Sequence, residues 1–395
     1  MPFNPSEKLQ VILDMMREFL DKEIIPLEKD LESKGFKAIV PDLEKKREMV
    51  RKMELWAPLH SKDMGGMGLP LMDVAMIFEI LGRSPLGLYV FGCQAPDAGN
   101  IEIIHKFGTE EQKEQYCRPT VEGKIRSCFA MTEVDVCGSN PTWILTTAVK
   151  DGDDYVINGQ KIWTSRAEHS DLMLLLARTK PLNQVSKKTD GLSVFLLDMR
   201  KAKGNGLTIR PIRTMMNHAT TEVFFDNLRI PASNLVGEEN KGFKYILSGM
   251  NAERILIAAE CIGDAKWFTK KSTNYANDRN IFGRAIGQNQ GVQFPIAKAY
   301  AHMKAAELMV YHAAKLYEAG KPIGEEANTA KLLAADASWE AAEACVQTHG
   351  GFGFAEEYDV ERKFREARLY QVAPISTNLI LSYIAEHVLG MPRSY

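Results

Sequence analysis

The spacing of apolar residues changes twice along this chain of 395 residues. From Pro5 to about Lys124, apolar side chains recur every three or four positions, which is typical of amphipathic helices. Proline and glycine interrupt helices, so we expect breaks at Pro41, at Gly65–Gly68 and at Pro85. The pattern predicts an N-terminal helical domain over residues 1–124. The first apolar set consists of Leu9, Ile12, Leu13, Met16, Phe19, Leu20 and Ile24.

Between about Ile125 and Leu235 the chain contains short runs rich in β-branched and aromatic residues, which predict strands. Asp151-Gly152 and Asn158-Gly159 are residue pairs that tight hairpin turns prefer. We therefore expect a middle β domain, a barrel or a sandwich, over residues 125–236. The predicted strand runs are SCFAMT, ILTTAV, YVING, KIWTS, LMLLLA, LSVFLL, LTIRPI and EVFF.

After Gly237 the helical spacing returns and continues to the end of the chain. Long helices are predicted from about Lys241 to Asn277 and from about Val292 to Ala319. A glycine-marked break at Gly350–Gly353 precedes a last helix from about Thr377 to Leu389. The chain is thus expected to be an α+β protein of three domains, with a helical bundle over residues 237–395.

Composition narrows the possible partners. The formal charge is only -2 and basic residues are spread along the chain, which argues against nucleic acid or an anionic membrane as a partner. No window reaches the 18 or so apolar residues of a membrane span. The six cysteines form no C-x-x-C pair and no histidine stands at metal-ligand spacing, so neither a disulfide framework nor a metal site is expected.

The N-terminal sequence MPFNPSEKLQ lacks both the apolar core of a signal peptide and an Arg/Ser-rich transit pattern. We therefore expect a cytoplasmic protein in a reducing compartment. An organellar protein whose leader has been removed would show the same features.

Four segments carry a resemblance to a known family. They are FAMTEVDVCGSN (129–140), KIWTS (161–165), YANDRNIFGRAIGQNQ (275–290) and QTHGGFGFAEEYDVERKFREAR (347–368). Together, and in this order, they resemble the acyl-CoA dehydrogenases, which are FAD-dependent enzymes. The family's fold has an N-terminal helical domain, a middle β-barrel domain and a C-terminal four-helix bundle, and the helical, β, helical order here is similar over essentially the full length.

The resemblance implies that the first two segments meet the flavin ring. Phe129, Met131 and Thr132 would lie at the pyrimidine end, and Ser139 near the flavin or the CoA phosphates. Trp163 would stack on the ring and Ser165 would bond near its reactive nitrogen. Taken alone, the first segment indicates only a Ser/Gly turn, and the second only a buried strand tryptophan.

The other two segments of the family reach the FAD of a neighbouring subunit. Arg279, Phe282 and Gln290 are implied to contact that cofactor, and the fork of an arginine suits a pyrophosphate. Similarly, Gln347, Gly350 and Gly351 would approach its adenosine part, where glycine lets the backbone come close. The resemblance therefore implies a homo-oligomer of at least two subunits, and most members are tetramers, built as dimers of dimers. Alone, these segments indicate a solvated basic loop and a helix break.

The catalytic base departs from the commonest family pattern. Many members carry a glutamate in the loop that reads QVAPISTN here (371–378). In this chain Pro374 stands at the position of that glutamate, and the loop contains no aspartate or glutamate. Isovaleryl-CoA and long-chain type members carry the base on the long helix instead. The matching segment, MNAERILIA, places Glu253 as the base and Arg254 as a CoA contact. A bare helical glutamate would otherwise indicate a solvated face.

Pro374 also lacks the main-chain N–H that, in the family, polarises the thioester carbonyl at this loop position. We expect Ile375 N–H to make that contact. A smaller departure is Val134, which stands where proline is usual, in a loop about one residue longer than the commonest form. The roles of Cys137, Gly138 and Ser139 therefore stay open.

The resemblance implies α,β-dehydrogenation of an acyl-CoA to a trans-2-enoyl-CoA, with electrons passed to an electron-transferring flavoprotein. Two alternatives remain open. One is a flavin oxidase or monooxygenase on the same fold, and the other is a catalytically silent flavoprotein scaffold, which the loss of the loop glutamate and N–H would favour. Acyl chain length and branching are not readable from the sequence.

Overall fold

The computed structural model describes residues 3–215 and 219–393, and this part of the chain forms two compact units. The first, called the helical unit, contains the described residues up to Leu55, Leu69–Phe91 and the chain from Asn251 onward. The second, called the sheet unit, contains Trp56–Gly68 and Gly92–Met250, without the gap at 216–218. Helix α10 (Gly242–Asp278) begins in the sheet unit and continues into the helical unit.

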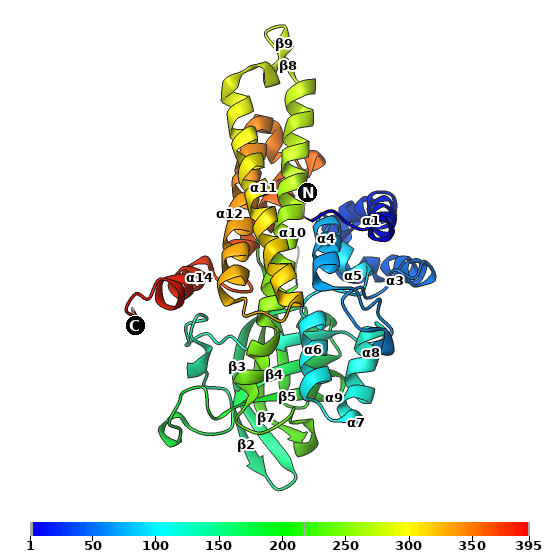
Figure 1. The fold of residues 1–395 in the computed structure, drawn as a ribbon. Coiled ribbons are helices and arrows are strands. Elements are labelled where there is room, and N and C mark those ends of the chain that lie inside the picture. The colour runs from blue at the N-terminus through cyan, green and yellow to red at the C-terminus, as the bar shows by residue number, and fades with distance from the viewer. Residues whose placement is uncertain (1–2, 216–218, 394–395) are drawn as a thin grey trace. The chain divides into compact units, whose positions relative to one another are not determined.

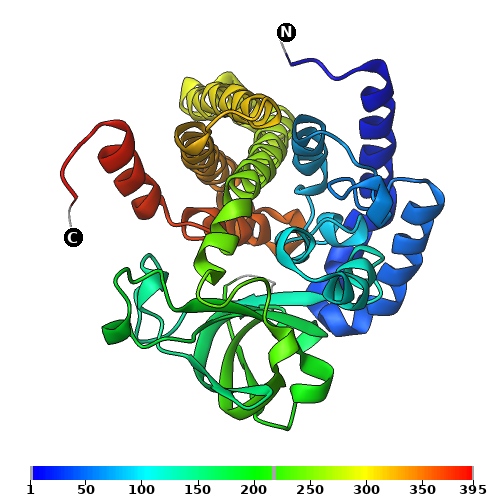
Figure 2. The same cartoon turned by 60° about the horizontal axis from the view of Figure 1, so that its bottom comes forward.

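The helical unit joins the first helices of the chain to its C-terminal helices. Helices α11 and α12 pack along each other beside the helical-unit part of α10, as Figures 1 and 2 both show. The early helix α4 packs against both α1 and α11. Besides α10, the α-helices of this unit are α1 (Glu7–Phe19), α2 (Glu28–Lys34), α3 (Phe36–Lys52), α4 (Leu71–Leu81), α5 (Gly87–Val90), α11 (Gln290–Glu318), α12 (Gly324–His349), α13 (Val360–Ala367) and α14 (Thr377–Tyr383).

Helix α1 shows why the predicted spacing yields a helix. The hydroxyl of Ser6 accepts the N–H of Leu9 at 3.2 Å and so caps the first turn. Leu9, Leu13, Met16 and Phe19 of the predicted apolar face are buried, which is the tertiary packing that stabilises an amphipathic helix, and Ile12 is half-buried. The expected break at Pro41 is wrong, because α3 runs through it. Proline removes one helical hydrogen bond there, and the burial of Ile39, Leu43 and Val50 holds the helix together.

The sheet unit contains one seven-stranded sheet. Its strands lie in the order β1-β4-β2-β3-β7-β6, and β5 pairs with β4. The pairings of β1 and β2 with β4 are parallel and the others are antiparallel. The strands are β1 (Ser127–Ala130), β2 (Thr147–Asp151), β3 (Asp154–Ser165), β4 (Leu172–Arg178), β5 (Leu192–Asp198), β6 (Leu207–Ile212) and β7 (Thr220–Pro231).

The sheet curls around a core that includes Tyr155, Phe195 and Phe225, and the curl is visible in Figure 2. Four short or medium α-helices belong to the same unit. They are α6 (Asp97–Phe107), α7 (Glu110–Gln112), α8 (Arg118–Val121) and α9 (Met199–Ala202).

One of the two predicted hairpin turns is present. Asp151 and Asp154 pair at the ends of β2 and β3, so Gly152 lies in the turn between them. The turn expected at Asn158-Gly159 is wrong, because both residues lie inside β3, where its register with β7 shifts. Gly159 has a φ of +144°, and a Cβ there would come within 2.8 Å of Thr146. The pair therefore marks a bulge with a close backbone approach.

Across residues 3–215 and 219–393, no helix is long and apolar enough to cross a membrane. The same residues hold no group of three His, Cys, Asp or Glu side chains placed for a metal ion.

Candidate active site

In the sheet unit, the end of β1 presents the first predicted flavin segment. Cys128 and Ala130 belong to the core, and side chains alternate along a strand. Phe129 therefore lies on the opposite face and is half-buried, and Met131, just past the end of the strand, is half-buried too. Thr132 follows, also half-buried, where the strand has ended.

Trp163 is turned outward by a bulge in β3. The register between β3 and β7 shifts between Lys161 and Thr164, and Trp163 has a φ of 60°. A left-handed backbone is unusual for a bulky residue, so the surrounding structure must hold it. The side chain is 57% exposed, and therefore the alternative of a buried strand tryptophan is wrong. Ser165, two residues on, is exposed at the end of the strand.

The two flavin segments lie side by side. The N–H of Ile162 donates to the carbonyl of Thr132 at 2.8 Å. The ammonium of Lys161 donates to the carbonyl of Met131 at 2.8 Å and to the Glu133 carboxylate at 2.8 Å. The structure thus brings Met131, Thr132 and Trp163 onto neighbouring stretches of main chain.

The sequence pattern assigns no site role to Lys161 or Glu133, although both lie within the flavin segments. Lys161 is fully buried, and burial lowers the pKa of its ammonium to about 8 although Glu133 opposes the shift. Burial acts to raise the pKa of Glu133, but Lys161 and bonds from Thr146 and Leu145 bring it below its usual value. A lysine inside a run that predicts a buried strand was the available signal, since buried lysines are almost always paired.

The loop after Thr132 contains Ser139, which is half-buried, and Cys137, which is exposed. It turns at residues 137–140, where the N–H of Asn140 donates to the carbonyl of Cys137 at 2.8 Å. A Cβ on Gly138 would lie 3.6 Å from the methyl group of Thr132. The turn therefore returns beside Thr132, which keeps Ser139 in the neighbourhood of the flavin segments.

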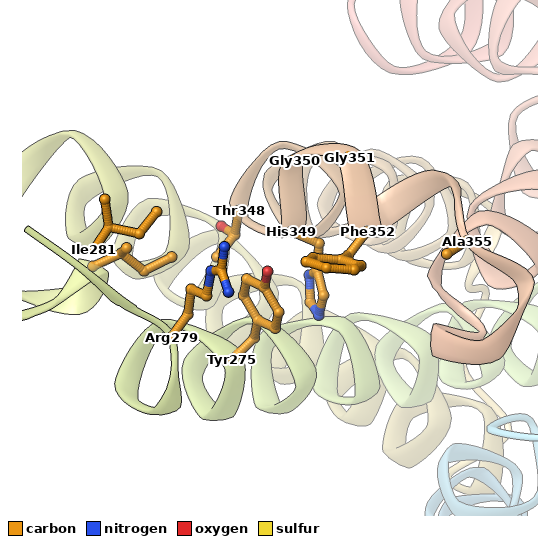
Figure 3. A pocket seen from close by; sticks show the side chains of 10 residues that line it. Tyr275, Arg279, Ile281, Thr348, His349, Gly350, Gly351, Phe352 and Ala355 are labelled. Atoms are coloured by element: carbon orange, nitrogen blue, oxygen red, sulfur yellow. The ribbon is translucent and has the colours of Figure 1, made fainter.

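The helical unit contains a groove of about 520 Å³ at the end of α12, shown in Figure 3. Arg279 lies 5.6 Å from the ring of Phe352, and Tyr275 stacks on His349 at 4.1 Å. Gly351 has open space where a Cβ would be. The lining residues are Tyr275, Arg279, Ile281, Ile286, Thr348, His349, Gly350, Gly351, Phe352 and Ala355.

This groove combines features that suit a nucleotide. A guanidinium can hold a pyrophosphate, an aromatic face can cover a base or sugar, and a glycine backbone without side chains permits close approach. The structure brings Arg279 together with Gly350 and Gly351 along this groove. The residues present therefore fit the nucleotide part of FAD.

Three other predicted cofactor residues do not line the groove. Phe282 lies in the turn between β8 (Asn280–Ile281) and β9 (Arg284–Ala285), fully exposed and with a φ of 52°. Gln290 is exposed at the start of α11, and Gln347 is exposed on the last turn of α12.

The predicted base lies on the helical-unit part of α10. Glu253 is half-buried, and so is Arg254, whose guanidinium donates to the Asn251 side chain. The Nε of Arg254 is buried without an acceptor in the described chain. Burial lowers the pKa of Arg254, opposed by Glu253 and Tyr383. The helix thus presents a carboxylate and an incompletely bonded cation at adjacent positions.

Hydrogen bonds from the Lys331 side chain anchor the main chain of the loop around Pro374. This lysine is fully buried and donates to the carbonyl of Ile375 at 2.9 Å and to that of Tyr370. Ile375 is itself buried, and within residues 3–215 and 219–393 its N–H has no hydrogen-bond acceptor. A buried donor without a partner is rare in folded proteins, which is consistent with a ligand oxygen as its acceptor.

Comparisons with known proteins show the family of the chain. Three family models match consecutive parts of the chain: the N-terminal domain of acyl-CoA dehydrogenases over residues 6–124, the middle domain over 128–228 and the C-terminal domain over 240–389.

Among similar proteins is an acyl-CoA dehydrogenase of Mycobacterium bovis, 33% identical over 364 residues, with 89% of this chain and 92% of the relative covered. A subunit of the caffeyl-CoA reductase-Etf complex of Acetobacterium woodii is 31% identical, with 93% and 94% covered. The butyryl-CoA dehydrogenase of Megasphaera elsdenii has a similar structure, with a TM-score of 0.86, 28% identity and 98% and 100% covered.

These findings define a flavoprotein oxidoreductase with a helical N-terminal region, a curled sheet and a helical C-terminal region. The chain belongs to the acyl-CoA dehydrogenase family, and its cofactor is FAD.

Proposed function

We propose that the chain oxidises an acyl-CoA thioester at the carbons α and β to the carbonyl, forming a trans-2-enoyl-CoA. The observation that carries this proposal is the pair of candidate groups in the helical unit: the Glu253 carboxylate on α10 and the unpartnered N–H of Ile375. Removal of an α proton needs a base and a stabilised enolate oxygen, and these two groups would supply them.

The roles of the chain's residues follow from that chemistry. The carboxylate of Glu253 would accept the proton from the α carbon. Ile375 N–H would donate to the thioester oxygen as negative charge develops there. Bound FAD would accept the hydrogen on the β carbon as a hydride. Arg254, whose Nε is buried and unbonded within the described residues, would hold a polar group of CoA.

The flavin ring is proposed to lie against Thr132 and Trp163, with Phe129, Met131 and Ser165 around it. Ser139 would contact the flavin or a CoA phosphate. The groove with Arg279, Gly350 and Gly351 would hold the nucleotide part of the FAD of a neighbouring subunit. The proposed assembly is a dimer of dimers, in which exposed Phe282, Gln290 and Gln347 complete the neighbour's site.

An electron-transferring flavoprotein is the proposed electron acceptor. The relative from Acetobacterium woodii is a subunit of a complex named for such a protein, which supports the same kind of partner here.

The names of two relatives favour a second function, the reverse reaction, in which an enoyl-CoA is reduced. That same relative is named as part of a reductase, and a 3-(aryl)acrylate reductase of Clostridium sporogenes is 28% identical over 389 residues. In this direction Glu253 would deliver the α proton to an enoyl substrate instead of removing it.

The two directions are tested by anaerobic spectroscopy of the purified flavoprotein. One sample of oxidised protein receives straight and branched saturated acyl-CoAs, and one sample of photoreduced protein receives the matching enoyl-CoAs. We expect the saturated thioesters to bleach the oxidised flavin, followed by turnover with an electron-transferring flavoprotein. Bleaching by none of them, with rapid reoxidation by enoyl-CoAs, would establish the reductase direction instead. Failure of both reactions would reject the proposed function.

A further inference from the structure

We propose that Lys161 and Glu133 are a buried positioning pair that holds Thr132 and Trp163 in the conformation that meets the flavin. This inference rests on the proposed placement of the ring at those two residues. It assigns a role to two buried side chains that would act through the main chain between them.

The contacts of Lys161 are directed and short. Its ammonium, with a side chain 0% exposed, donates to the Met131 carbonyl at 2.8 Å and to the Glu133 carboxylate at 2.8 Å. Glu133 also accepts the N–H groups of Leu145 at 2.5 Å and Thr146 at 2.9 Å. The pair therefore joins three stretches of chain: the loop after β1, the segment before β2, and β3.

These contacts fix the direction of a peptide group. In a trans peptide the C=O and the following N–H point in opposite directions. Because the Met131 carbonyl points at Lys161, the N–H of Thr132 points away from it. That N–H has no acceptor in residues 3–215 and 219–393, while the Thr132 carbonyl is held by Ile162 N–H at 2.8 Å. The result is a free main-chain donor, fixed on both sides, of the kind an electron-rich flavin edge requires.

The same pair anchors the bulge that exposes Trp163. The left-handed backbone of Trp163 lies two residues after Lys161, and the N–H of Ile162 between them is bonded to Thr132. A strained backbone conformation of this kind persists only where contacts on both sides hold it in place. Lys161 holds the strand on one side of the bulge, and the β7 pairing of Thr164 holds it on the other.

Stability alone does not explain a charged pair at this position. Two buried charges carry a desolvation penalty that their attraction barely offsets, and apolar residues of similar volume often stabilise a protein equally well. An apolar residue at 161 could fill the space but could not bind the Met131 carbonyl. The pair therefore fixes the geometry of the main chain at Met131 and does more than fill space in the core.

The test compares Lys161→Met and the double variant Lys161→Met/Glu133→Leu with the parent. The double variant removes both charges together and so keeps the test valid if the single variant folds poorly. Lys266→Met is the matched control, because Lys266 also pairs with two carboxylates, those of Glu79 and Glu307, but lies in no flavin segment. The readouts are the FAD dissociation constant of the apoprotein, the absorbance spectrum of bound flavin and the amide exchange rate of Ile162.

In both Lys161 variants the Thr132 N–H would no longer be fixed toward the flavin. We expect the FAD dissociation constant to rise by about 10-fold to 100-fold, which is the range for loss of a hydrogen bond to a charged group. The flavin spectrum should shift and Ile162 should exchange faster, whereas Lys266→Met should lower only the melting temperature. A folded double variant with unchanged FAD affinity, spectrum and Ile162 exchange would overturn the inference. Trp163→Ala tests the ring placement separately, because it removes the aromatic face proposed to stack on the flavin: if it leaves the spectrum unchanged, the ring placement itself is wrong.

Discussion

His60 provides a prediction whose size follows from the structure. Its side chain is 5% exposed in the sheet unit, and burial, followed by the charge of His105, lowers its pKa from 6.5 to about 4. The unfolded chain therefore binds more protons than the folded one between these two values. Stability is therefore unaffected by this group above pH 6.5, falls as the pH drops from 6.5 to about 4, and falls no further on this account below about 4.

The magnitude comes from the gap between the two pKa values. At 1.36 kcal/mol for each pH unit, a pKa lowered from 6.5 to about 4 amounts to about 3 kcal/mol of stability lost by pH 4. We expect His60→Leu to remove this loss, because leucine fills a similar volume and does not titrate.

The assay is urea unfolding of parent and variant at several pH values from 7.5 to 4. The difference in unfolding free energy between the two proteins should shift by about 3 kcal/mol across that range, in favour of the variant at low pH. His312→Gln, at an exposed position on α11, controls for the loss of a histidine as such. Parallel pH profiles for parent and His60→Leu would refute the reasoning.

Three further variants test the proposed sites. Arg279→Met should weaken FAD binding about 10-fold or more, measured by flavin fluorescence during reconstitution, since a charged hydrogen bond to phosphate is lost; unchanged affinity would exclude Arg279 from the cofactor site. Ile375→Pro should lower the bleaching rate about 100-fold to 1000-fold with FAD content unchanged, because it removes the donor N–H; a normal rate would place the oxyanion donor elsewhere. Phe282→Ser should shift the sedimentation profile toward smaller species, and an unchanged profile would show that the hairpin tip lies outside the subunit interface.

Much of the architecture could be predicted because it depends on periodicity. The apolar face of α1 is set by burial on one side, and the continuous apolar runs of β4 and β5 by burial on both faces, and the sequence displays both patterns directly. The break at Pro41 was wrong since tertiary burial of one face outweighed a single missing hydrogen bond. The turn at Asn158-Gly159 was wrong since the same residue pair also suits a bulge, and only strand pairing distinguishes the two.

The sequence could predict which types of residue the candidate site contains, but not how those residues are placed relative to one another. The approach of Arg279 to Gly350 and Gly351 joins segments about seventy residues apart, and no local pattern shows it. The outward aim of Trp163 depends on a left-handed backbone that no propensity favours for tryptophan. No local pattern indicates the role of Lys161, because its partners, the Met131 carbonyl and Glu133, come together only in the fold.

The most direct test of the central claim is the anaerobic bleaching rate of Glu253→Gln with the best saturated acyl-CoA. Glu260→Gln is the matched control: the same change on the same helix, seven residues or about 10 Å further along. Our account predicts that Glu253→Gln retains FAD but bleaches at least about 100-fold more slowly than the parent, while Glu260→Gln stays close to it. Bleaching of Glu253→Gln at the parental rate would contradict the account and require a base elsewhere in the chain.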